Sequence, residues 1–255
     1  MDHEILVSIM KRLGLNMLLL STCLVSKSWL NATLDALFPP CHAFDLRDCS
    51  VFSTTSHCQY RKRNRLWKMI ELHLNRNLPT QHYYTSLVLR HRNLTIYAYR
   101  FIAQRLPSIT SLTICNIGLP KLLKFRDFAS CWKGLVEVDC DASCVRGIGL
   151  LWNQIHKLKL YGDIKVHEAI SIANDFPCLT HLSLKYCKLS DDGLSLILEG
   201  QKNLTYLNMT HARVGGKRNA KDWDKDLLLL ASKIPQFLRC EMGNCCSCFP
   251  CYRPS

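Results

Sequence analysis

A pattern of apolar residues spaced as apolar-x-x-apolar-x-apolar recurs along most of this chain of 255 residues. Its clear copies are Tyr84/Leu87/Leu89, Ile109/Leu112/Ile114, Leu135/Val138/Cys140, Ile155/Leu158/Leu160, Leu179/Leu182/Leu184 and Leu204/Leu207/Met209. The central residues of successive copies are 25, 26, 20, 24 and 25 positions apart. A period of this length indicates one supersecondary unit per copy, and a single unit cannot bury its own apolar face. Neighbouring units must therefore stack, which constrains the fold more than any other feature of the sequence.

The pattern and its period are similar to those of leucine-rich repeats, in which about 20–29 residues form a short strand and a return element. The resemblance implies an α/β solenoid with curved parallel strands and outer helices. Solenoids of this kind usually bind other macromolecules along an extended surface. We therefore expect a binding protein.

The chain before the first clear copy has a different pattern, which predicts helices only. Ile5, Leu6 and Ile9 recur at helical spacing, and Asp2 is placed to cap the helix that they begin. Two further apolar stretches follow. The prolines at 39–40 end this block, because proline cannot continue a helix.

Residues 2–38 resemble an F-box. The most specific part of the resemblance is Val25-Ser26-Lys27-Ser28-Trp29, and Glu4-Ile5-Leu6 precedes it in the order and spacing of that family. In that family the three-helix module docks on a Skp-type adaptor and, through it, on the cullin scaffold of a ubiquitin ligase. When the adaptor-binding positions of that family are transferred to this sequence, the resemblance implies that seven side chains form or support the adaptor interface. These are Ile5, Leu6, Ile9, Leu18, Leu19, Val25 and Trp29.

An F-box followed by repeats resembles the F-box/LRR substrate receptors, and this likeness extends over nearly the whole chain. Two features depart from the family pattern: Met17 stands where an acidic residue is usual, and no Leu-Pro pair opens the motif. These departures predict a smaller adaptor contact. The alternative is that residues 2–38 only cap the open end of the solenoid.

The sequence predicts two domains, an F-box-like domain at 1–40 and a leucine-rich-repeat domain at 41–255. Within the second domain, the polar and basic residues at about 50–65 have the composition of a loop. The apolar spacing over residues 66–74 predicts a helix instead of another repeat. A cysteine-rich tail occupies about 240–255.

Weaker copies extend the apolar pattern at both ends. Cys41/Phe44/Leu46 precede the clear copies, and Phe237/Cys240/Met242 follow them, with Cys240 as the central residue. The return elements are predicted as helices where apolar spacing agrees with a capping residue or a following proline. They are Thr95–Arg105, Val166–Asn174, a helix from Asp191 onwards and Asp224–Lys233.

Side chains alternate along a strand, so the neighbours of each central apolar residue should line the inner face of the sheet. Parallel stacking then places Glu137 beside Lys157 and Asp139 beside Lys159. This acidic-then-basic stripe is either a set of register pairs within the sheet or a surface that recognises a target protein. The candidates for target binding are Glu137, Asp139, Lys157, Lys159, Tyr161, His181, Lys185 and Tyr206.

The net charge of +13 makes nucleic acid, acidic lipid or an acidic protein possible partners, while the local clusters that carry much of it also fit solvated loops. We do not expect nucleic acid among them, because carboxylates at 137, 139 and 141 interrupt the basic groove that a polyanion needs. No apolar run approaches the roughly 18 residues of a membrane span. The N-terminus lacks the basic-then-apolar pattern of a secretory signal, which predicts a cytoplasmic or nuclear location.

The 15 cysteines would suggest disulfides in a secreted domain, but in a reducing compartment we expect structural thiols. Cys187 falls three residues after Leu184, where one repeat subtype places a buried cysteine. Cys248 and Cys251 form one CxxC pair without a second one, so we expect no metal and no other cofactor.

No catalytic constellation is visible in the sequence. Gly216-Lys217 lacks the rest of a phosphate-binding loop, and His167-Glu168 lacks the second histidine of a zinc-protease helix. We therefore expect a non-catalytic receptor subunit of an SCF-type ubiquitin ligase, in which the F-box-like helices hold the adaptor and the repeats select a target for ubiquitination. The competing interpretation is a leucine-rich-repeat interaction scaffold with a degenerate F-box that does not recruit the ligase.

Overall fold

The computed structural model describes residues 2–39, 41–46, 57–76, 84–89, 95–114, 123–217 and 222–240. Contacts between residues divide the chain into two compact units. Unit 1 comprises Met1–Ile117 and Lys124–Gly134, and unit 2 comprises Gly118–Leu123 and Leu135–Ser255. The N-terminal helices therefore share a unit with the first strands, and the two units do not divide at residue 40.

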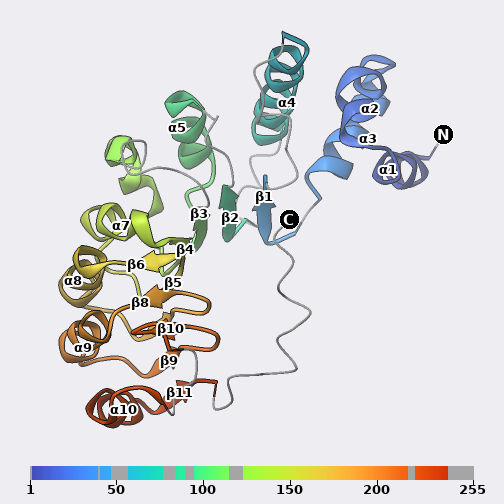
Figure 1. The fold of residues 1–255 in the computed structure, drawn as a ribbon. Helices are drawn as coiled ribbons and strands as arrows, with labels where there is room; N and C mark the ends of the chain where they lie inside the picture. Colours follow the sequence, from blue (N-terminus) through green and yellow to red (C-terminus); the bar gives the residue numbers. More distant parts are fainter. Residues whose placement is uncertain are drawn as a thin grey trace. The chain divides into compact units, whose positions relative to one another are not determined.

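Unit 1 begins with a group of short helices (Figure 1), which enclose a small apolar core. They are α1 (His3–Lys11), α2 (Leu15–Leu20), the 3-10 turn η1 (Thr22–Leu24) and α3 (Lys27–Leu37). Asp2 caps α1 as predicted, since its carboxylate accepts a hydrogen bond of 3.2 Å from the backbone N–H of Glu4. Ser26 caps α3, accepting a hydrogen bond of 3.3 Å from the backbone N–H of Trp29. The core consists of Leu6, Met10, Leu18 and Ala32.

The next helix of unit 1, α4 (His57–Arg76), corrects one prediction. We predicted a basic loop at about 50–65, but residues 57–65 are helical, while residues 50–56 lie outside the described part. Leu66 and Ile70 are buried, as the helical spacing predicted, and they fix one face of α4. The basic residues before them are good helix formers, so the helix extends through them. Composition alone did not distinguish a basic helical segment from a loop.

The strands of unit 1 pair in parallel and confirm the first copies of the apolar pattern. They are β1 (Ala43–Asp45), β2 (Ser86–Leu89) and β3 (Ser111–Ile114). Their register aligns Phe44 with Leu87, and Leu87 with Leu112. The predicted helix between β2 and β3 is present as α5 (Ile96–Arg105), which Thr95 caps. Two 3-10 turns, η4 (Leu123–Asp127) and η5 (Ala129–Trp132), follow β3 in the sequence.

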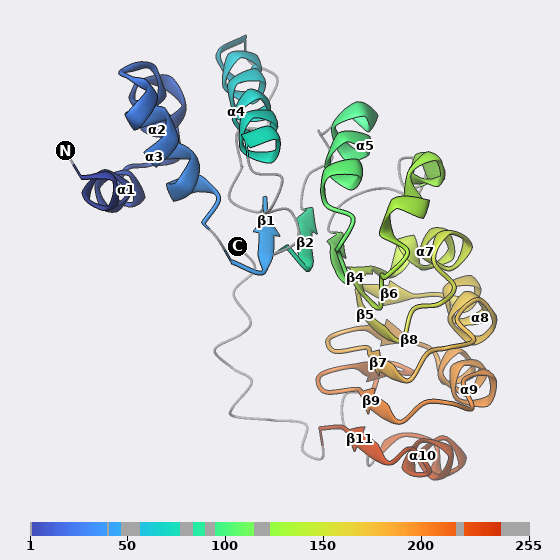
Figure 2. The same cartoon turned by 180° about the vertical axis from the view of Figure 1, so that it is seen from behind.

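Unit 2 contains the later repeats, with strands on one side and helices on the other (Figure 2). Its inner parallel strands are β4 (Glu137–Asp141), β5 (Lys157–Tyr161), β7 (His181–Ser183), β9 (Tyr206–Asn208) and β11 (Gln236–Leu238). The return elements are η6 (Ala142–Cys144), α7 (Val145–Leu151), α8 (Val166–Asn174), α9 (Asp191–Gly200) and α10 (Lys225–Ser232). All of the predicted helices are thus confirmed. A second, smaller parallel sheet contains β6 (Asp163–Ile164), β8 (Lys188–Leu189) and β10 (Arg213–Val214).

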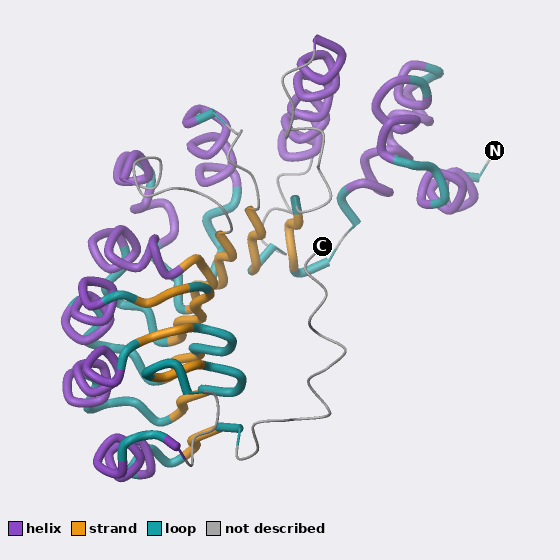
Figure 3. Tube along the Cα trace, in the orientation of Figure 1, coloured by secondary structure: helices purple, strands orange, loops and turns teal. Residues whose placement is uncertain are grey.

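The register of unit 2 confirms the predicted stacking of the central residues. Val138 pairs with Leu158, Leu158 with Leu182, and Leu182 with Leu207. The solvent exposure of all four side chains is 0%. The short step between β4 and β5 is accommodated by the small return of η6 and α7. Figure 3 shows the strand, loop and helix of each repeat in succession.

The last copy of the pattern corrects a second prediction. We expected Cys240 to be the central residue, but β11 pairs Phe237 with Leu207. The prolonged return through α10 therefore ends three residues earlier than we predicted. The expected third position, Met242, lies outside the described residues. An aromatic ring fills the apolar place of a terminal strand better than a thiol, which the spacing rule ignored.

Candidate functional site

Some of the residues predicted to contact an adaptor are exposed on the surface, and others are buried in the core of the module. Ile5, Ile9 and Val25 expose 53%, 40% and 60% of their surface. Ile5 and Ile9 lie four residues apart on α1 and so share one face of that helix. Trp29 is partly buried against the core of the module. The remaining predicted residues are buried, with exposures of 4% or less, and can act only by shaping the module: Leu6, Leu18 and Leu19.

Further apolar side chains of these helices are exposed but were not among the predicted adaptor residues. They are Met17, Leu20 and Leu24, with exposures of 52%, 36% and 66%. Leu24 directly precedes Val25 in the motif, so the sequence carried a signal for it. Exposed apolar residues at such a density on one small module are typical of a protein-binding surface.

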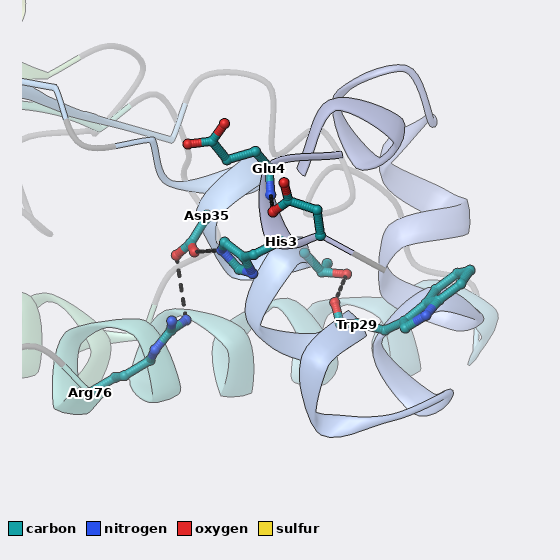
Figure 4. A network of polar contacts seen from close by, with 7 residues as sticks. His3, Glu4, Trp29, Asp35 and Arg76 are labelled. Atoms are coloured by element: carbon teal, nitrogen blue, oxygen red, sulfur yellow. Dashed lines mark hydrogen bonds and ion pairs between the residues drawn. The ribbon is translucent and has the colours of Figure 1, made fainter. Parts of the chain in front are cut away.

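Polar contacts hold the module against α4 within unit 1. The Asp35 carboxylate accepts from His3 Nε2 at 2.8 Å and from Arg76 Nη1 at 3.4 Å (Figure 4). The Arg65 guanidinium donates to the backbone oxygens of Leu19 and Leu20 at 3.3 and 3.2 Å. A cation at these carbonyls satisfies acceptors that the end of α2 leaves open. In Figure 4 the Trp29 ring points away from the Asp35 carboxylate.

The predicted target-binding residues of unit 2 lie on the inner strands. Burial alternates along β4 and β5, as predicted for strands with one buried face. The register places Glu137, Lys157, His181 and Tyr206 in one row across the strands. Asp139 and Lys159 are neighbours in the next row, as predicted.

The ion pair on this face is diagonal. Lys159 Nζ contacts Glu137 Oε1, which belongs to the row of Lys157, so the register pairs are not the ion pairs. The hydrogen bond to Glu137 raises the pKa of the Lys159 ammonium. The long lysine side chain reaches across one row, which the register alone does not specify.

Asp139 lies in the middle of this charged group. Burial raises the pKa of its carboxyl above the ordinary range; the Glu137 charge acts in the same direction, and a hydrogen bond from Tyr161 and the Lys159 charge act against it. Its Oδ1 atom has no hydrogen-bond partner among the described residues. A half-buried carboxyl of this kind favours its protonated form more than an exposed aspartate does.

Two aromatic stacks join the repeats of β7 and β9. The rings of His181 and Tyr206 are 5.5 Å apart with an interplanar angle of 23°. The rings of Tyr186 and His211 are 4.7 Å apart with an angle of 19°. The first stack contains two predicted residues, and sequence reasoning missed the second. Each stack presents both an apolar ring and a polar tip.

Tyr186 and His211 also adopt a rare backbone conformation. Their φ angles are 64° and 62°, in the left-handed region. For residues other than glycine this conformation costs about 1–2 kcal/mol. Gly162, with φ of 93°, occupies the same region after β5 without that cost. The glycine was the sequence signal that could have identified this turn position.

The neighbours of the second stack are polar. Lys185 Nζ lies 5.0 Å from the centre of the Tyr186 ring, which places the predicted residue Lys185 at this stack. Burial and the Lys185 charge lower the pKa of His211. Cys240 Sγ lies 3.2 Å from the backbone nitrogen of His211 and 3.3 Å from its Nδ1. His211 is therefore fixed by two contacts to one sulfur atom.

Cys187 confirms the buried position predicted for it. Its exposure is 0%, and its thiol donates to the backbone oxygen of Leu160 at 3.1 Å. Burial raises the pKa of this thiol to about 12, and the nearby carboxylates of Asp163 and Asp141 add to the effect. It is a structural residue and not an available nucleophile.

Within the described ranges, no group of three or more histidine, cysteine or acidic side chains is arranged to hold a metal ion. None of the helices described is long and apolar enough to cross a bilayer. The arrangement on the inner strands offers hydrogen bonds, charges and ring faces, which are the means of recognising a polypeptide.

Comparison with protein families agrees with the fold. A model of the leucine-rich repeat family matches residues 177–198. This segment contains β7, β8 and most of α9, together with the buried Cys187. Comparison with curated proteins gives no match for this chain. The chain thus contains leucine-rich repeats in a parallel α/β arrangement, and this architecture indicates a capacity for protein interaction.

Proposed function

We propose that this protein is the substrate-recognition subunit of an SCF-type cullin–RING ubiquitin ligase. In this proposal the N-terminal helices bind a Skp-type adaptor, and the inner strands of unit 2 bind a target protein. The subunit itself is not catalytic. It raises the effective concentration of target lysines near the ubiquitin-conjugating enzyme that its partners supply.

The observation that carries the adaptor half is the exposure of apolar side chains at the motif positions. Val25 is the residue most exposed among the predicted adaptor contacts, and it directly precedes the Ser26 cap of α3. Ile5 and Ile9 expose a second apolar strip on α1. Burying these side chains in a partner would stabilise a complex by roughly 25 cal/mol per Å² of apolar surface.

The target half is supported by the mixed character of the inner strands. Carboxylates, lysines and one aromatic stack lie on neighbouring strands, and a second stack lies in the turns that follow β7 and β9. Such a surface favours specificity over bulk affinity, because each charged group excludes partners of the same charge.

Co-purification with a Skp-type adaptor tests the proposal. We expect Val25→Asp and Ile9→Asp to abolish adaptor binding without changing the melting temperature, because both side chains are exposed. Leu150→Asp is the matched control, since Leu150 exposes 67% of its surface on α7, far from the motif in sequence. Trp29→Ala is a poorer test, because Trp29 packs on the module core.

Two results would count against the proposal. Wild-type protein that fails to bind the adaptor would favour the scaffold interpretation, in which the helices only cap the repeats. The contacts of Arg65 and Arg76 with α2 and α3 suit that second role as well. If the combined changes Glu137→Ala, Lys159→Ala and Tyr206→Ala leave target binding intact, the inner strands are not the recognition surface.

A further inference from the structure

Two neighbouring repeats hold an aromatic residue where a turn favours glycine. The backbone N–H of Cys187 donates to the oxygen of Leu184 at 3.0 Å, and that of Ala212 donates to Met209 at 3.1 Å. These bonds close four-residue turns whose third residues are Tyr186 and His211. The third position of such a turn with positive φ is normally glycine or asparagine.

Retaining these aromatic residues opposes the stability of the fold. Glycine would relieve the left-handed strain at both positions, as Gly162 does after β5. Backbone strain of this kind persists only where the surrounding structure enforces it, and it is concentrated at functional sites. The two residues in these strained turns are the ones whose rings stack.

The strained pair is held in a fixed and accessible arrangement. Tyr186 exposes 40% of its surface, and Cys240, which follows β11, contacts the His211 ring at Nδ1. The turns after β7 and β9 extend beyond the strands on the side away from the helices (Figure 3). A rigid, exposed aromatic residue loses little entropy on binding, and tyrosine is common among the residues that dominate interfaces.

The charge at this pair is positive. The Lys185 ammonium lies over the Tyr186 ring and is close enough to lower the pKa of His211. In the small sheet next to these turns, Lys188 and Arg213 are register neighbours. Asp163 pairs with Lys188 at 3.2 Å, which neutralises one of the two cations. The remaining charge complements a carboxylate or another anion.

We propose that Lys185, Tyr186 and His211 form a docking platform for an acidic segment of the target protein that also carries an aromatic side chain. Because His211 stacks on the Tyr186 ring and Lys185 lies over it, the aromatic side chain would meet the exposed edge of that ring, and the carboxylate would pair with Lys185. This inference rests on the proposed function, because it specifies the target that the repeats would select. A short acidic segment can end before it reaches β4, whereas an extended nucleic acid would bring further phosphates to the Glu137 and Asp139 carboxylates, which would repel them.

Selection from a library of random peptides displayed on phage, with the full-length protein as bait, tests the platform directly. We expect enriched peptides that combine acidic and aromatic residues. Tyr186→Gly and His211→Gly should each lower the affinity for the tightest-binding peptide at least about tenfold. Lys185→Glu should shift the selection towards basic peptides. Lys202→Glu is the matched control, an exposed lysine in the turn before β9, and should change neither result.

Thermal melting separates a binding role from a structural one. Tyr186→Gly should melt at the same temperature as the wild type or higher, since it relieves strain. A lower melting temperature together with lost peptide binding would show that the stack supports the fold, and would overturn the proposal. So would enriched peptides that are basic or share no composition.

A separate binding measurement tests the nucleic-acid alternative. A labelled oligothymidylate should not bind at moderate salt, and binding that depends on Tyr186 would overturn the proposal in favour of base stacking. The peptide selection needs no adaptor. Loss of adaptor co-purification with intact peptide selection would therefore refute the ligase function and leave the platform standing, and the reverse result would refute the platform alone.

Discussion

His73 Nε2 lies 2.9 Å from the hydroxyl oxygen of Tyr84, inside an aromatic cluster of unit 1. The His73 ring is 4.8 Å from the Phe38 ring, and Tyr84 meets Phe44 edge-on at 5.2 Å. Burial lowers the pKa of His73 from 6.5 to about 4, and it raises that of Tyr84 to about 12. The second ring nitrogen of His73 has no partner among the described residues. The cluster is thus built for a neutral imidazole.

The first prediction concerns acid sensitivity. Because the pKa of His73 is lower in the folded chain, the unfolded chain binds more protons between pH 6.5 and about 4. The free energy of unfolding should therefore decrease as the pH is lowered across that window, by roughly 3 kcal/mol in total. Urea denaturation at several pH values measures this. His73→Gln cannot titrate, so an unchanged slope in that variant would assign the effect to other groups.

The second prediction concerns Asp139. The pKa of its carboxyl is raised in the folded chain, so the folded state holds this proton more tightly and ionisation at higher pH is unfavourable there. The contribution of Asp139 to the free energy of unfolding is present at low pH. It is lost as the pH rises from the ordinary pKa of aspartate through the raised pKa of the folded chain. We expect Asp139→Asn to leave the melting temperature at neutral pH unchanged or raised. A clear decrease would show that the ionised carboxylate is a required partner.

The third prediction concerns the ion pair of the inner strands. Glu137→Gln and Lys159→Met, alone and combined, should give a coupling free energy of about 0–1 kcal/mol, because half of the lysine side chain is exposed. The coupling should shrink in high salt. Chemical denaturation of the four proteins measures it. A coupling well above this range would mean that the pair is shielded from solvent.

The fourth prediction concerns Arg65. Arg65→Ala removes both hydrogen bonds to the end of α2 and should cost about 1 kcal/mol. The loss should be local, so hydrogen exchange should accelerate in α2 before it does in α5. Arg65→Lys keeps the charge on a shorter side chain, and is expected to restore only part of the protection.

The fifth prediction concerns the stacked core. Leu182→Ala removes a fully buried side chain and should destabilise unit 2 by about 2–5 kcal/mol. Leu150→Ala, at an exposed position, should change stability by less than about 0.5 kcal/mol. Similar effects of the two changes in thermal melting would contradict the predicted role of the central leucines.

The repeats could be predicted because their signal is redundant. Leu87, Leu158 and Leu182 each occupy one place in a pattern that recurs many times, and all three are buried within strands. The isolated last copy had no such support, and its central residue proved to be Phe237. The loop prediction for the basic segment before Leu66 was wrong because charged residues suit a helix as well as a loop.

For the candidate site, the sequence predicted which residues lie side by side on neighbouring strands, but not which of their side chains interact. Alternation along the strands placed Glu137 and Lys157 side by side, but not the reach of Lys159 across to Glu137. Tyr186 and His211 escaped notice because the left-handed turn position that they occupy normally carries glycine or asparagine, and neither repeat has one there.

The contacts of α4 bear on how the N-terminal helices can be studied. A fragment that ends after α3 would leave the Asp35 carboxylate without Arg76, and the carbonyls of Leu19 and Leu20 without Arg65. Water would replace those donors, and the end of α2 would fray. The flank of α2 that packs against α4 would also be uncovered. Binding experiments on such a fragment would report on a surface that the intact protein keeps covered, so expression should continue through residue 134, where unit 1 ends.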